Sequence, residues 1–378
     1  MKTLKYKLYR TRKNKRFHKD IGLACEIYNH CIALHKRYYK LFGKYLNVYT
    51  LQRHLTKIKK LKKFSHWKKL GSQVIQDITF RIDKGYKLFF QERKVGNKNI
   101  APPSFCKRSK YKSVTYTQAG YKYLGENRIK IGKHNYKFSL SRPIEGKIKT
   151  MTLKRDSLGD FYIFFTVELE EEKLEATSDK IVGFDFGLRT FLTASDENNV
   201  MSPQFLKSGL GKIRAFSRQL SRKQKGSNNR WRARRNLARQ HKRVSDKRRD
   251  WFFKQAHDLC RQYKMISLET LDIKSMAKRW GRKINDIAFS EFVQILEYIA
   301  TKYDTSIHFC DKYFASSKTC SLCDNYNGDL ELRDKKWTCG ICQTELHRDK
   351  NASYNILRAG ASAHGLGDIR PTLLAVSA

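Results

Sequence analysis

The chain has 378 residues and a formal net charge of +44, from 79 lysines and arginines against 35 aspartates and glutamates. Its content of 40% hydrophobic residues excludes a disordered polyelectrolyte and favours a folded protein. A folded surface with this excess of positive charge repels itself unless a polyanion neutralises it, so nucleic acid is the expected partner. An anionic membrane is the competing explanation. However, no apolar run approaches the roughly 20 residues that span a bilayer, and the N-terminus lacks the apolar centre of a signal peptide.

The N-terminal quarter of the chain predicts one strand followed by three helices. Residues 4–10 alternate apolar and basic side chains, which is typical of a strand. Apolar residues at helical spacing predict helices over about residues 18–42, ending at Gly43, and over residues 51–61 and 72–92. The outward residues of these helices are mostly Lys, Arg, His and Gln, which suits either a nucleic-acid-binding face or an ordinary solvated one.

After Pro102 and Pro103 the chain changes to short runs of alternating apolar and polar residues. Gly, Asn and Asp turns separate these runs, which is typical of an antiparallel sheet or a small barrel that the first strand joins. The runs are SVTYTQA, RIKIG, YKFSL, GKIKTMTLKR and FYIFFTVEL. The acidic segment ELEEEKLEATSDK follows and predicts a linker into a new domain.

Three acids of this new domain stand out from apolar surroundings. Asp185 lies inside the apolar strand KIVGFDFG, Glu269 ends the apolar strand MISLE, and Asp349 begins a helix. A carboxylate inside a buried strand costs several kcal/mol unless it is paired or bound to a cation; for Asp185 a strand-end turn is the simpler alternative. If the fold brings the three acids together, Mg²⁺ would remove their repulsion. Two such ions, roughly 3.5–4 Å apart, are typical of phosphodiester hydrolysis.

The order of elements around these acids predicts an α/β domain with a mixed sheet. Residues 286–304 carry apolar side chains at helical spacing, and SIHFC (306–310) returns as a strand. Between Asp185 and Glu269, residues 212–255 form the most basic segment of the chain and predict two long helices joined at GSNN. A basic coiled coil is the alternative, but no heptad pattern is sustained. We therefore expect phosphate contacts from this segment, specifically from Arg222, Lys223, Lys225, Arg232, Arg235 and Arg239.

Four of the nine cysteines form two Cys-x-x-Cys pairs, Cys320/Cys323 and Cys339/Cys342, with fifteen residues between the pairs. Two such turns complete a closed tetrahedral site, which predicts one structural Zn²⁺. A redox site would need one pair in a thioredoxin-like context, which is absent. The zinc site has two open roles: it could simply pin the hairpin, or it could also present to nucleic acid the side chains of Lys335, Lys336 and Trp337.

Several motifs, in this order, resemble the TnpB family of transposon-encoded RNA-guided nucleases, which is related to type V CRISPR effectors. They are GFDFG, KGSNNRWRARRNLARQHKRVSDKRRDW, SLETLDIKSM, SSKTCSLC, WTCGIC and HRDKNASYNIL. The resemblance covers essentially the whole chain and implies a multidomain α/β protein. Its parts would be a wedge β-barrel (1–16 and 100–176), a helical recognition domain (17–99), a RuvC, RNase H-like nuclease domain with a mixed sheet (179–318 and 344–378) and a zinc-ribbon insert that binds target nucleic acid (319–343).

The resemblance also assigns roles to residues. It makes Asp185, Glu269 and Asp349 the catalytic, Mg²⁺-binding acids of a RuvC-type endonuclease. The sequence departs from the family motif at Leu346-His347-Arg348-Asp349, because His347 stands where the family has a first aspartate. The resemblance further implies that the helices and the barrel read a short DNA motif next to the target. The residues expected to do so are Gln73, Gln76, Thr117 and Gln118.

The implied function is RNA-guided cutting of double-stranded DNA next to that motif, with a guide RNA from the transposon end. A companion transposase encoded nearby is a further expected partner, no membrane is involved, and the expected location is the prokaryotic cytoplasm, on the nucleoid. Two alternatives remain open. One is an RNA-guided repressor that binds DNA without cutting it, and the other is a transposase that works without RNA.

Overall fold

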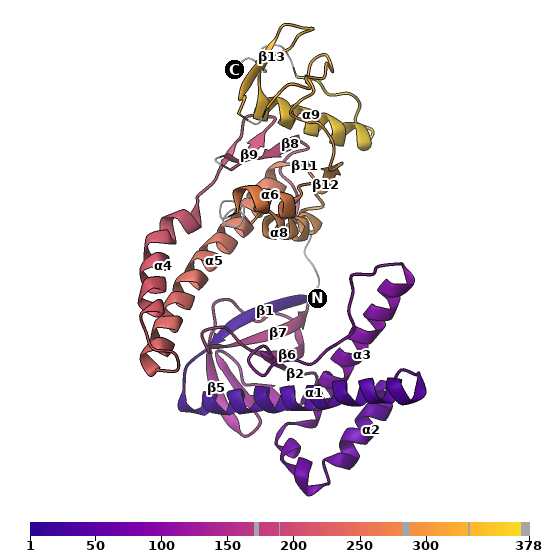
Figure 1. Cartoon of the computed structure of the whole chain (residues 1–378), viewed down its shortest axis with the longest axis vertical. Coiled ribbons are helices and arrows are strands. Elements are labelled where there is room, and N and C mark those ends of the chain that lie inside the picture. Colours follow the sequence, from indigo (N-terminus) through magenta and orange to yellow (C-terminus); the bar gives the residue numbers. More distant parts are fainter. Residues whose placement is uncertain (170–173, 189, 282–287, 332, 372–378) are drawn as a thin grey trace. The chain divides into compact units, whose positions relative to one another are not determined.

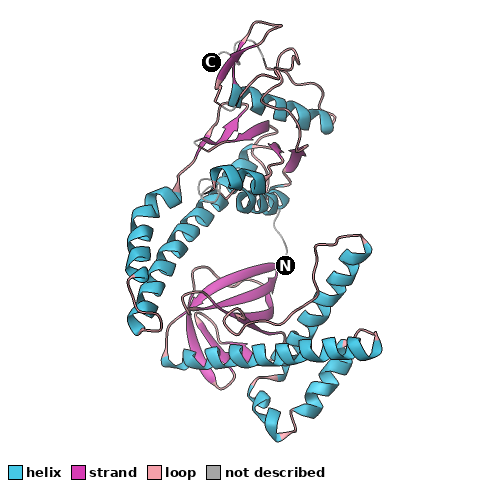
Figure 2. Ribbon diagram, viewed as in Figure 1, coloured by secondary structure: helices cyan, strands magenta, loops and turns pink. Residues whose placement is uncertain are grey.

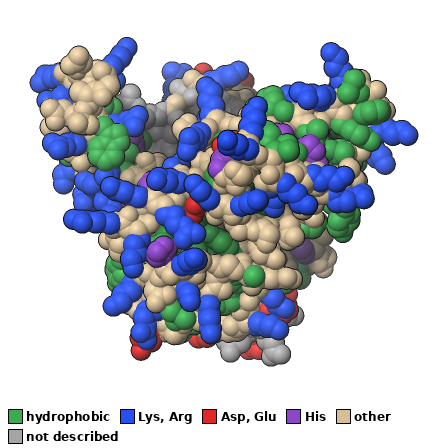
Figure 3. Space-filling view, turned by 90° about the horizontal axis from the view of Figure 1, so that it is seen from below, with side chains coloured by type: hydrophobic (Ala, Val, Ile, Leu, Met, Phe, Trp, Pro, Cys, Tyr) green, Lys and Arg blue, Asp and Glu red, His purple; other side chains and the backbone are tan. Residues whose placement is uncertain are grey.

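The computed structural model describes all residues except 170–173, 189, 282–287, 332 and 372–378. It forms two compact units, Met1–Glu170 and Glu171–Ala378 (Figure 1). None of the described helices has the length and apolarity needed to cross a bilayer. Lys and Arg side chains are spread over the face shown in Figure 3, where few Asp and Glu side chains are visible.

The first unit is built on a seven-stranded antiparallel sheet with the order β2-β6-β7-β1-β5-β4-β3. The N-terminal strand β1 pairs with both β7 and β5, which confirms that it joins this sheet. Its buried residues Leu4, Tyr6 and Leu8 alternate with exposed ones, as the sequence pattern predicts. The strands are β1 Lys2–Leu8, β2 Ser113–Tyr116, β3 Tyr121–Tyr123, β4 Arg128–Ile131, β5 His134–Ser139, β6 Lys147–Arg155 and β7 Phe161–Glu168.

The connection between β2 and β3 shows that this sheet curls into a near-closed barrel. These strands lie at opposite ends of the hydrogen-bonding order, yet only four residues separate Tyr116 from Tyr121. A flat sheet of seven strands would hold its edges about 29 Å apart, whereas this connection reaches at most about 18 Å. The rings of Tyr116 and Tyr121 are in fact 6.4 Å apart, centroid to centroid.

Helices lie between β1 and β2 in the chain and pack on the barrel. Helix α1 places Phe17 against the rings of Tyr136 and Phe161 on the sheet. It ends where Gly43 adopts a left-handed φ of 61°, a conformation that glycine allows. The three predicted helices are confirmed to within a few residues, as α1 Lys15–Phe42, α2 Val48–Ile58 and α3 Ser72–Lys94, with short 3₁₀ turns at Arg12–Asn14 and Lys62–Lys69.

The second unit contains a five-stranded sheet with the order β10-β9-β8-β11-β12. β8 pairs in parallel with β11, and β11 with β12, whereas β9 and β10 are antiparallel to their neighbours. The predicted mixed sheet is therefore confirmed. Its strands are β8 Ile181–Phe186, β9 Thr190–Ala194, β10 Val200–Met201, β11 Met265–Glu269 and β12 Ser306–Cys310.

Helices cover both faces of this sheet (Figure 2). α5 and α8 bury Phe252 and Phe292 against the face that carries Phe184. α9 covers the other face at very close range, because a Cβ at Gly183 would come within 2.3 Å of the Ser353 carbonyl. The helices are α4 Phe205–Ser221, α5 Asn228–Gln262, α6 Ile273–Trp280, α8 Phe289–Tyr303 and α9 Arg348–Ala363.

The basic segment forms two long helices, as predicted. α4 and α5 pack against each other and are joined by residues 222–227, and GSNN (226–229) runs from this connection into the first turn of α5. Ser227 caps α5 by accepting a hydrogen bond from the Arg230 amide at 3.1 Å. The Arg230 guanidinium in turn donates to the carbonyls of Leu220 and Lys223 at the end of α4. One arginine of this cationic pair of helices is therefore used for the turn itself.

Candidate active site and metal centre

The strands β8 and β11 place Asp185 and Glu269 on the same face of the mixed sheet. Alternate residues of a strand share a face, so Asp185 lies on the side of Gly183, and Glu269 lies on the side of Ser267. Both Gly183 and Ser267 contact α9. Gly183 lies against the backbone of the helix, and Ser267 lies against Gly360. The two strands run in parallel with Leu268 opposite Phe184, so the two acids come next in the register.

Helix α9 carries Asp349 on the stripe that faces this sheet. Residues spaced by three or four lie on one side of a helix, and Asp349, Ser353, Leu357 and Gly360 follow that spacing. The last three contact β8 and β11 directly. Asp349 is therefore on the sheet side of the first turn of α9, where its carboxylate also suits the positive end of the helix dipole.

The electrostatics of Asp185 show that the three acids are close neighbours. Burial raises the pKa of Asp185 well above its usual range, and the carboxylates of Glu269 and Asp349 raise it further, while Arg348 opposes the rise. Burial also raises the pKa of Glu269, against hydrogen bonds from Asp185 and from the backbone N–H of Phe186. At pH values below its raised pKa, Asp185 keeps its proton and donates a hydrogen bond to Glu269, so that the two buried carboxyl groups avoid repulsion.

The three carboxylates do not converge on a single point. Among the described residues, only the four cysteines bring three or more candidate ligand atoms within 4.8 Å of one another. Asp349 is instead paired with its neighbour Arg348, whose Nη2 and Nε lie 2.9 and 3.1 Å from Oδ1. The fold thus brings Asp185 and Glu269 into contact and holds Asp349 beside them.

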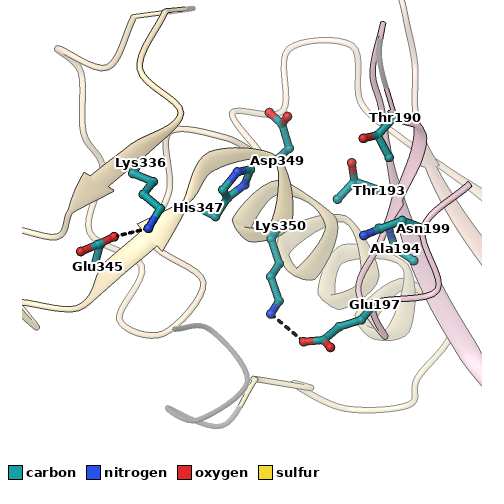
Figure 4. Close-up of a pocket in the computed structure, with 10 residues that line it drawn as sticks. All are labelled: Thr190, Thr193, Ala194, Glu197, Asn199, Lys336, Glu345, His347, Asp349 and Lys350. Carbon is teal, nitrogen blue, oxygen red and sulfur yellow. Dashed lines mark hydrogen bonds and ion pairs between the residues drawn. The ribbon is translucent and has the colours of Figure 1, made fainter. Parts of the chain in front are cut away.

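A polar cleft of about 390 Å³ opens beside Asp349. Figure 4 shows Asp349 at the N-terminal end of α9 and Thr190 and Thr193 on strand β9. Thr193 is the register partner of Asp185, so the cleft reaches β9, the strand next to the one that carries the first acid. Its other lining residues are Ala194, Glu197, Asn199, Lys336, Glu345, His347 and Lys350. A second cavity, of about 250 Å³, is lined by Glu269 and by the Phe186 and Phe289 side chains.

The cleft contains two lysines that sequence reasoning did not place beside the acids: Lys350, which it missed, and Lys336, which it named only as a possible contact to nucleic acid. Lys350, whose side chain is only 13% exposed, pairs with Glu197 at 2.7 Å, and Lys336 pairs with Glu345 at 2.8 Å. Arg348 lies next to Asp349, as described above. The pattern HRDK places one cation on each side of Asp349 in the sequence. That local charge is the signal from which cations beside this acid could have been predicted.

The four cysteines form a cluster that could hold a metal ion. The Sγ atoms of Cys320 and Cys342 are 3.7 Å apart, and those of Cys323 and Cys339 are 3.5 Å apart. A tetrahedral site with Zn–S bonds of about 2.3 Å requires sulfur atoms about 3.8 Å from one another. The four thiols could therefore bind one zinc ion with little movement.

The backbone around the second cysteine pair favours thiolates. Burial acts against it, but the amide N–H groups of Cys342 and Ile341 lower the pKa of Cys339 to about 6. Burial raises the pKa of Cys320 to about 12, so without metal the cluster shares protons unequally. A bound divalent ion would displace those protons, since thiolates are the ligands.

The small core next to the cysteines corrects one expectation about nucleic acid. β13 (Lys336–Thr338) and β14 (Glu345–His347) form the hairpin that carries the second pair. Trp337 in this hairpin is only 8% exposed and packs with Leu330, Leu346 and Tyr354. The four cysteines with β13 and β14 are called the zinc module below. Trp337 belongs to the core of this module and is not presented to a partner, whereas Lys335 and Lys336 are exposed.

Comparison with known proteins identifies the family. Residues 164–279 match the family OrfB_IS605, described as "Probable transposase", and residues 289–356 match the family "Cas12f1-like, TNB domain". A "Putative RNA-guided DNA endonuclease" of Streptomyces pristinaespiralis is 30% identical, over 98% of this chain and 92% of the relative. The chain belongs to the TnpB family. Further TnpB relatives are similar over most or part of the chain: "Putative RNA-guided DNA endonuclease InsQ" of Escherichia coli K12 (26% identity, 92% of this chain, 89% of the relative) and "TnpB-like protein L79" of Acanthamoeba polyphaga mimivirus (29%, 59% and 46%).

Solved structures support the fold of a TnpB protein. The "Cryo-EM structure of the Cas12f1-sgRNA-target DNA complex" contains a chain that matches with a TM-score of 0.57 and 14% identity. That match covers 92% of this chain and 83% of the other. The "Structure of the mini-RNA-guided endonuclease CRISPR-Cas_phi3" matches with a TM-score of 0.55 and 10% identity, over 98% and 93%. At these identities the likeness concerns the fold alone.

The residues expected to read a DNA motif divide into a pair and two single positions. Thr117, just after β2, donates a hydrogen bond to the Gln73 side chain on α3, so the fold brings these two together. Gln76 is exposed and lines a separate cavity of about 590 Å³ between α2 and α3. Gln118 is exposed in the loop after β2. For a TnpB protein this places Gln73 and Thr117 at one junction of helix and barrel.

The basic residues expected to contact phosphates lie on α5 and on the turn before it. Arg222, Lys223, Lys225, Arg232 and Arg239 are exposed, and no ion pair with an acid of the described chain holds them. Arg235 differs from them. It is half-buried and its guanidinium lies 4.9 Å from the Trp231 ring, in a cation–π contact.

Proposed function

We propose that this protein is an RNA-guided DNA endonuclease that cuts its target next to a short adjacent motif. The observation that carries this proposal is the placement of Asp185, Glu269 and Asp349 on facing surfaces of β8, β11 and α9. Burial raises the pKa of Asp185, and the charges of Glu269 and Asp349 raise it further, which is typical of a site that is completed by divalent cations. The names of the TnpB relatives support the same activity.

The residues that would hold Mg²⁺ are Asp185, Glu269 and Asp349, and an oxygen donor set of this kind fits Mg²⁺ better than a softer ion. Two bound Mg²⁺ ions would supply an activated water and charge neutralisation at the phosphate. The chain's own groups orient the substrate: Lys350 and Lys336 place positive charge at the cleft that contains Asp349, and the hydroxyls of Thr190 and Thr193 lie beside them.

The domain division proposed from the family resemblance is consistent with the order of elements. Helices α1, α2 and α3 interrupt the barrel between β1 and β2, as a recognition domain inserted into a wedge would do. The mixed sheet with α9 on one face supports a RuvC, RNase H-like nuclease domain, and the module of β13 and β14 supports a zinc-binding insert. In this assignment zinc is structural, because four cysteines leave no open coordination position.

We assign the exposed cations of α5 and of the preceding turn to the backbone of guide RNA or target DNA. Basic side chains that contact phosphates fix position without reading sequence. Sequence would instead be read by base pairing between the guide and one DNA strand, and the protein would read only the adjacent motif. The net charge of +44 supports such an extended contact with nucleic acid.

The test is a cleavage assay with the protein purified together with its RNA, a DNA library that varies the bases next to a matched target, and Mg²⁺. We expect cutting that depends on the RNA, on one adjacent motif and on Mg²⁺. Binding of the matched DNA without cutting under all these conditions would contradict the endonuclease and favour a repressor. Cutting or strand transfer that survives complete removal of RNA would instead favour a transposase, the activity named in the OrfB_IS605 description.

A further inference from the structure

Helix α9 has a second functional side, directed away from the mixed sheet. Residues 349 and 351 are separated by about 200° around a helix with 3.6 residues per turn. Asn351 and Asn355, one turn apart, therefore lie on a different side from the stripe that carries Asp349. Both side chains are buried, with 1% and 3% exposure. Buried amides of this kind need specific hydrogen-bond partners.

The partners of both asparagines are backbone groups in and just before the first Cys-x-x-Cys turn, Cys320–Cys323, which we call the zinc turn. The Oδ1 atom of Asn351 accepts from the Ser321 N–H at 2.9 Å, and its Nδ2 donates to the Thr319 carbonyl at 2.7 Å. Thr319 and Ser321 are the residues on either side of the zinc ligand Cys320. Asn355 adds two bonds of 2.7 Å, from its Nδ2 to the carbonyls of Thr319 and Ser316. Side-chain amides of α9 thus bind the first Cys-x-x-Cys turn by hydrogen bonds to its main chain.

These bonds are well placed to fix the first turn of α9. The close contacts between α9 and the sheet, at Gly183 and Gly360, involve Ser353 and residues beyond it. They set the distance of the middle and end of the helix from the sheet, but they begin one turn after Asp349. Asn351 is only two residues from Asp349 and is held on the opposite side of the helix by the zinc turn. The orientation of the Asp349 turn is therefore set jointly by the sheet and by the zinc module.

We infer that Asn351 and Asn355 are positioning residues that couple the zinc turn to Asp349, so that the zinc module sets how well the acid cluster binds its divalent ion. This inference rests on the proposed function, because it takes Asp349 as a ligand of that ion. Groups that orient a metal ligand from outside the coordination sphere typically change metal affinity or activity 10–100-fold when they are removed. The zinc ion would then contribute to cleavage without touching the DNA.

The test compares Asn355→Leu and Asn351→Asp with the wild-type protein in its complex with RNA and matched DNA. Asn351→Asp keeps the acceptor for the Ser321 N–H but loses the donor to Thr319. We expect one zinc per chain and normal DNA binding in both variants. Mn²⁺ affinity, measured from the paramagnetic resonance signal of free Mn²⁺, should fall about 10–100-fold. The Mg²⁺ concentration for half-maximal cleavage should rise by a similar factor, and the cleavage rate should recover at saturating Mg²⁺.

Arg358→Gln is the matched control. Arg358 also joins α9 to the zinc turn, through its ion pair with Asp324, and it pairs with Asp368 after the helix, but it lies nine residues beyond Asp349. It should leave Mn²⁺ affinity and Mg²⁺ dependence unchanged. Wild-type Mn²⁺ affinity in both asparagine variants would overturn the inference and leave the endonuclease standing. Loss of zinc from both would also overturn it, because the amides would then hold the zinc turn itself. If the wild-type complex binds Mn²⁺ but never cuts, the proposed function fails, and Mn²⁺ binding still decides the role of the amides.

Discussion

The second unit contains two sites suited to different metal ions, and the fold assembles them in different ways. The four thiols come from residues 320–342 and already lie within 4.8 Å of one another. The three acids come from residues 185–349 and lie near one another only because two parallel strands and a helix bring their segments together. Asp185 and Glu269 touch, while Asp349 remains paired with Arg348.

The contrast follows from the charge of the ligands. A thiol without metal can keep its proton and pack as a small apolar group, so a cysteine cluster can close before zinc arrives. Carboxylates are ionised at neutral pH in water, and a buried cluster must either keep a proton, as Asp185 does, or bind a cation before all three can close. Local turns are therefore sufficient for the zinc site, whereas the acid site needs a rigid scaffold that holds repelling groups near each other.

The largest effect should come from removing the central acid. Asp185→Ala is expected to reduce RNA-guided cleavage about 10³-fold or more, because metal ions at such a site supply several kcal/mol of transition-state stabilisation. Zinc content and RNA-dependent DNA binding should remain, because the zinc site is built separately. Single-turnover cleavage, zinc analysis and a DNA-binding assay measure the three quantities on the same preparation.

A variant that still cut DNA at the wild-type rate would show that the three acids are not the active site. Asp272→Ala provides a matched control. Asp272 follows the same strand as Glu269 but is paired with Lys312 at 2.9 Å and lies at the surface. It should cut normally.

The second largest effect should come from opening the zinc site. Cys323→Ser is expected to abolish zinc binding, since structural zinc sites of this type contribute about 10–16 kcal/mol through all their ligands together. Cleavage should fall at least about tenfold, because the turn that is hydrogen-bonded to α9 loses its metal ion and no longer orients Asp349. Melting of the first unit, followed through its own buried Trp67, should be unchanged.

Zinc loss without any loss of cleavage would show that the zinc site does not affect the acid site. Cys106→Ser is the control for cysteine chemistry in general. Cys106 is a partly exposed cysteine of the first unit, distant in sequence from the zinc turns. Its replacement should alter neither zinc content nor cleavage.

The zinc site and the acids differ in how far the sequence alone could predict them. Cys-x-x-Cys spacing encodes the zinc geometry locally, so the pattern predicts all four ligands. The strands of Asp185 and Glu269 and the helix of Asp349 are also predicted, because apolar periodicity marks each of them. Their register could not be predicted. It depends on pairing between strands that are about 80 residues apart in the chain and on glycine contacts that no local pattern records.

Other misses have similar causes. The strand β3 was not predicted, because Tyr121–Tyr123 is too short to show alternation. The two lysines before Trp337 make it a candidate contact to nucleic acid, but the hairpin buries its side chain in the core beside the cysteines. The roles of Asn351 and Asn355 could not be predicted either, because their partners are main-chain atoms and carry no sequence signal.

A moderate effect on stability should expose the repulsion between the acids. Since the native pKa of Asp185 is raised, the folded protein holds a proton that the unfolded chain releases at lower pH. Without divalent ions the wild-type protein should therefore lose stability as pH rises from the ordinary carboxyl range up to the raised pKa. Asp185→Asn removes this loss. Its melting temperature in buffer without Mg²⁺, with the zinc site still loaded, should exceed that of the wild type by roughly 2–4 °C per kcal/mol of relieved repulsion.

Adding Mg²⁺ should reverse the order, because only the wild-type cluster gains from a bound cation. The control is the same pair of proteins melted at a pH below the ordinary carboxyl range, where their stabilities should converge. Equal melting temperatures at all pH values, with and without Mg²⁺, would mean that the acids do not repel one another in the folded protein.

A smaller effect is expected on the basic helices, which serve neither metal site. Arg232→Ala should weaken RNA binding a few-fold and reduce the slope of log affinity against log salt by about 1, the change expected for one lost phosphate contact. Lys254→Ala is the matched control on α5, since Lys254 already pairs with Asp250 at 2.9 Å. An unchanged slope for Arg232→Ala would remove this arginine from the phosphate contacts. Titrations of RNA binding at several salt concentrations give both quantities.

The smallest effect on nucleic acid should come from Trp337. Trp337→Leu keeps an apolar side chain in the zinc core but removes the indole ring that this hairpin could offer to a base. Because Trp337 is buried, affinity for RNA and for target DNA should stay at the wild-type value, while the second unit loses about 1–3 kcal/mol of stability. Stacking on a base contributes about 1–3 kcal/mol, so an affinity loss of more than about fivefold in the zinc-loaded variant would show that the hairpin opens and that the zinc module contacts nucleic acid through its core.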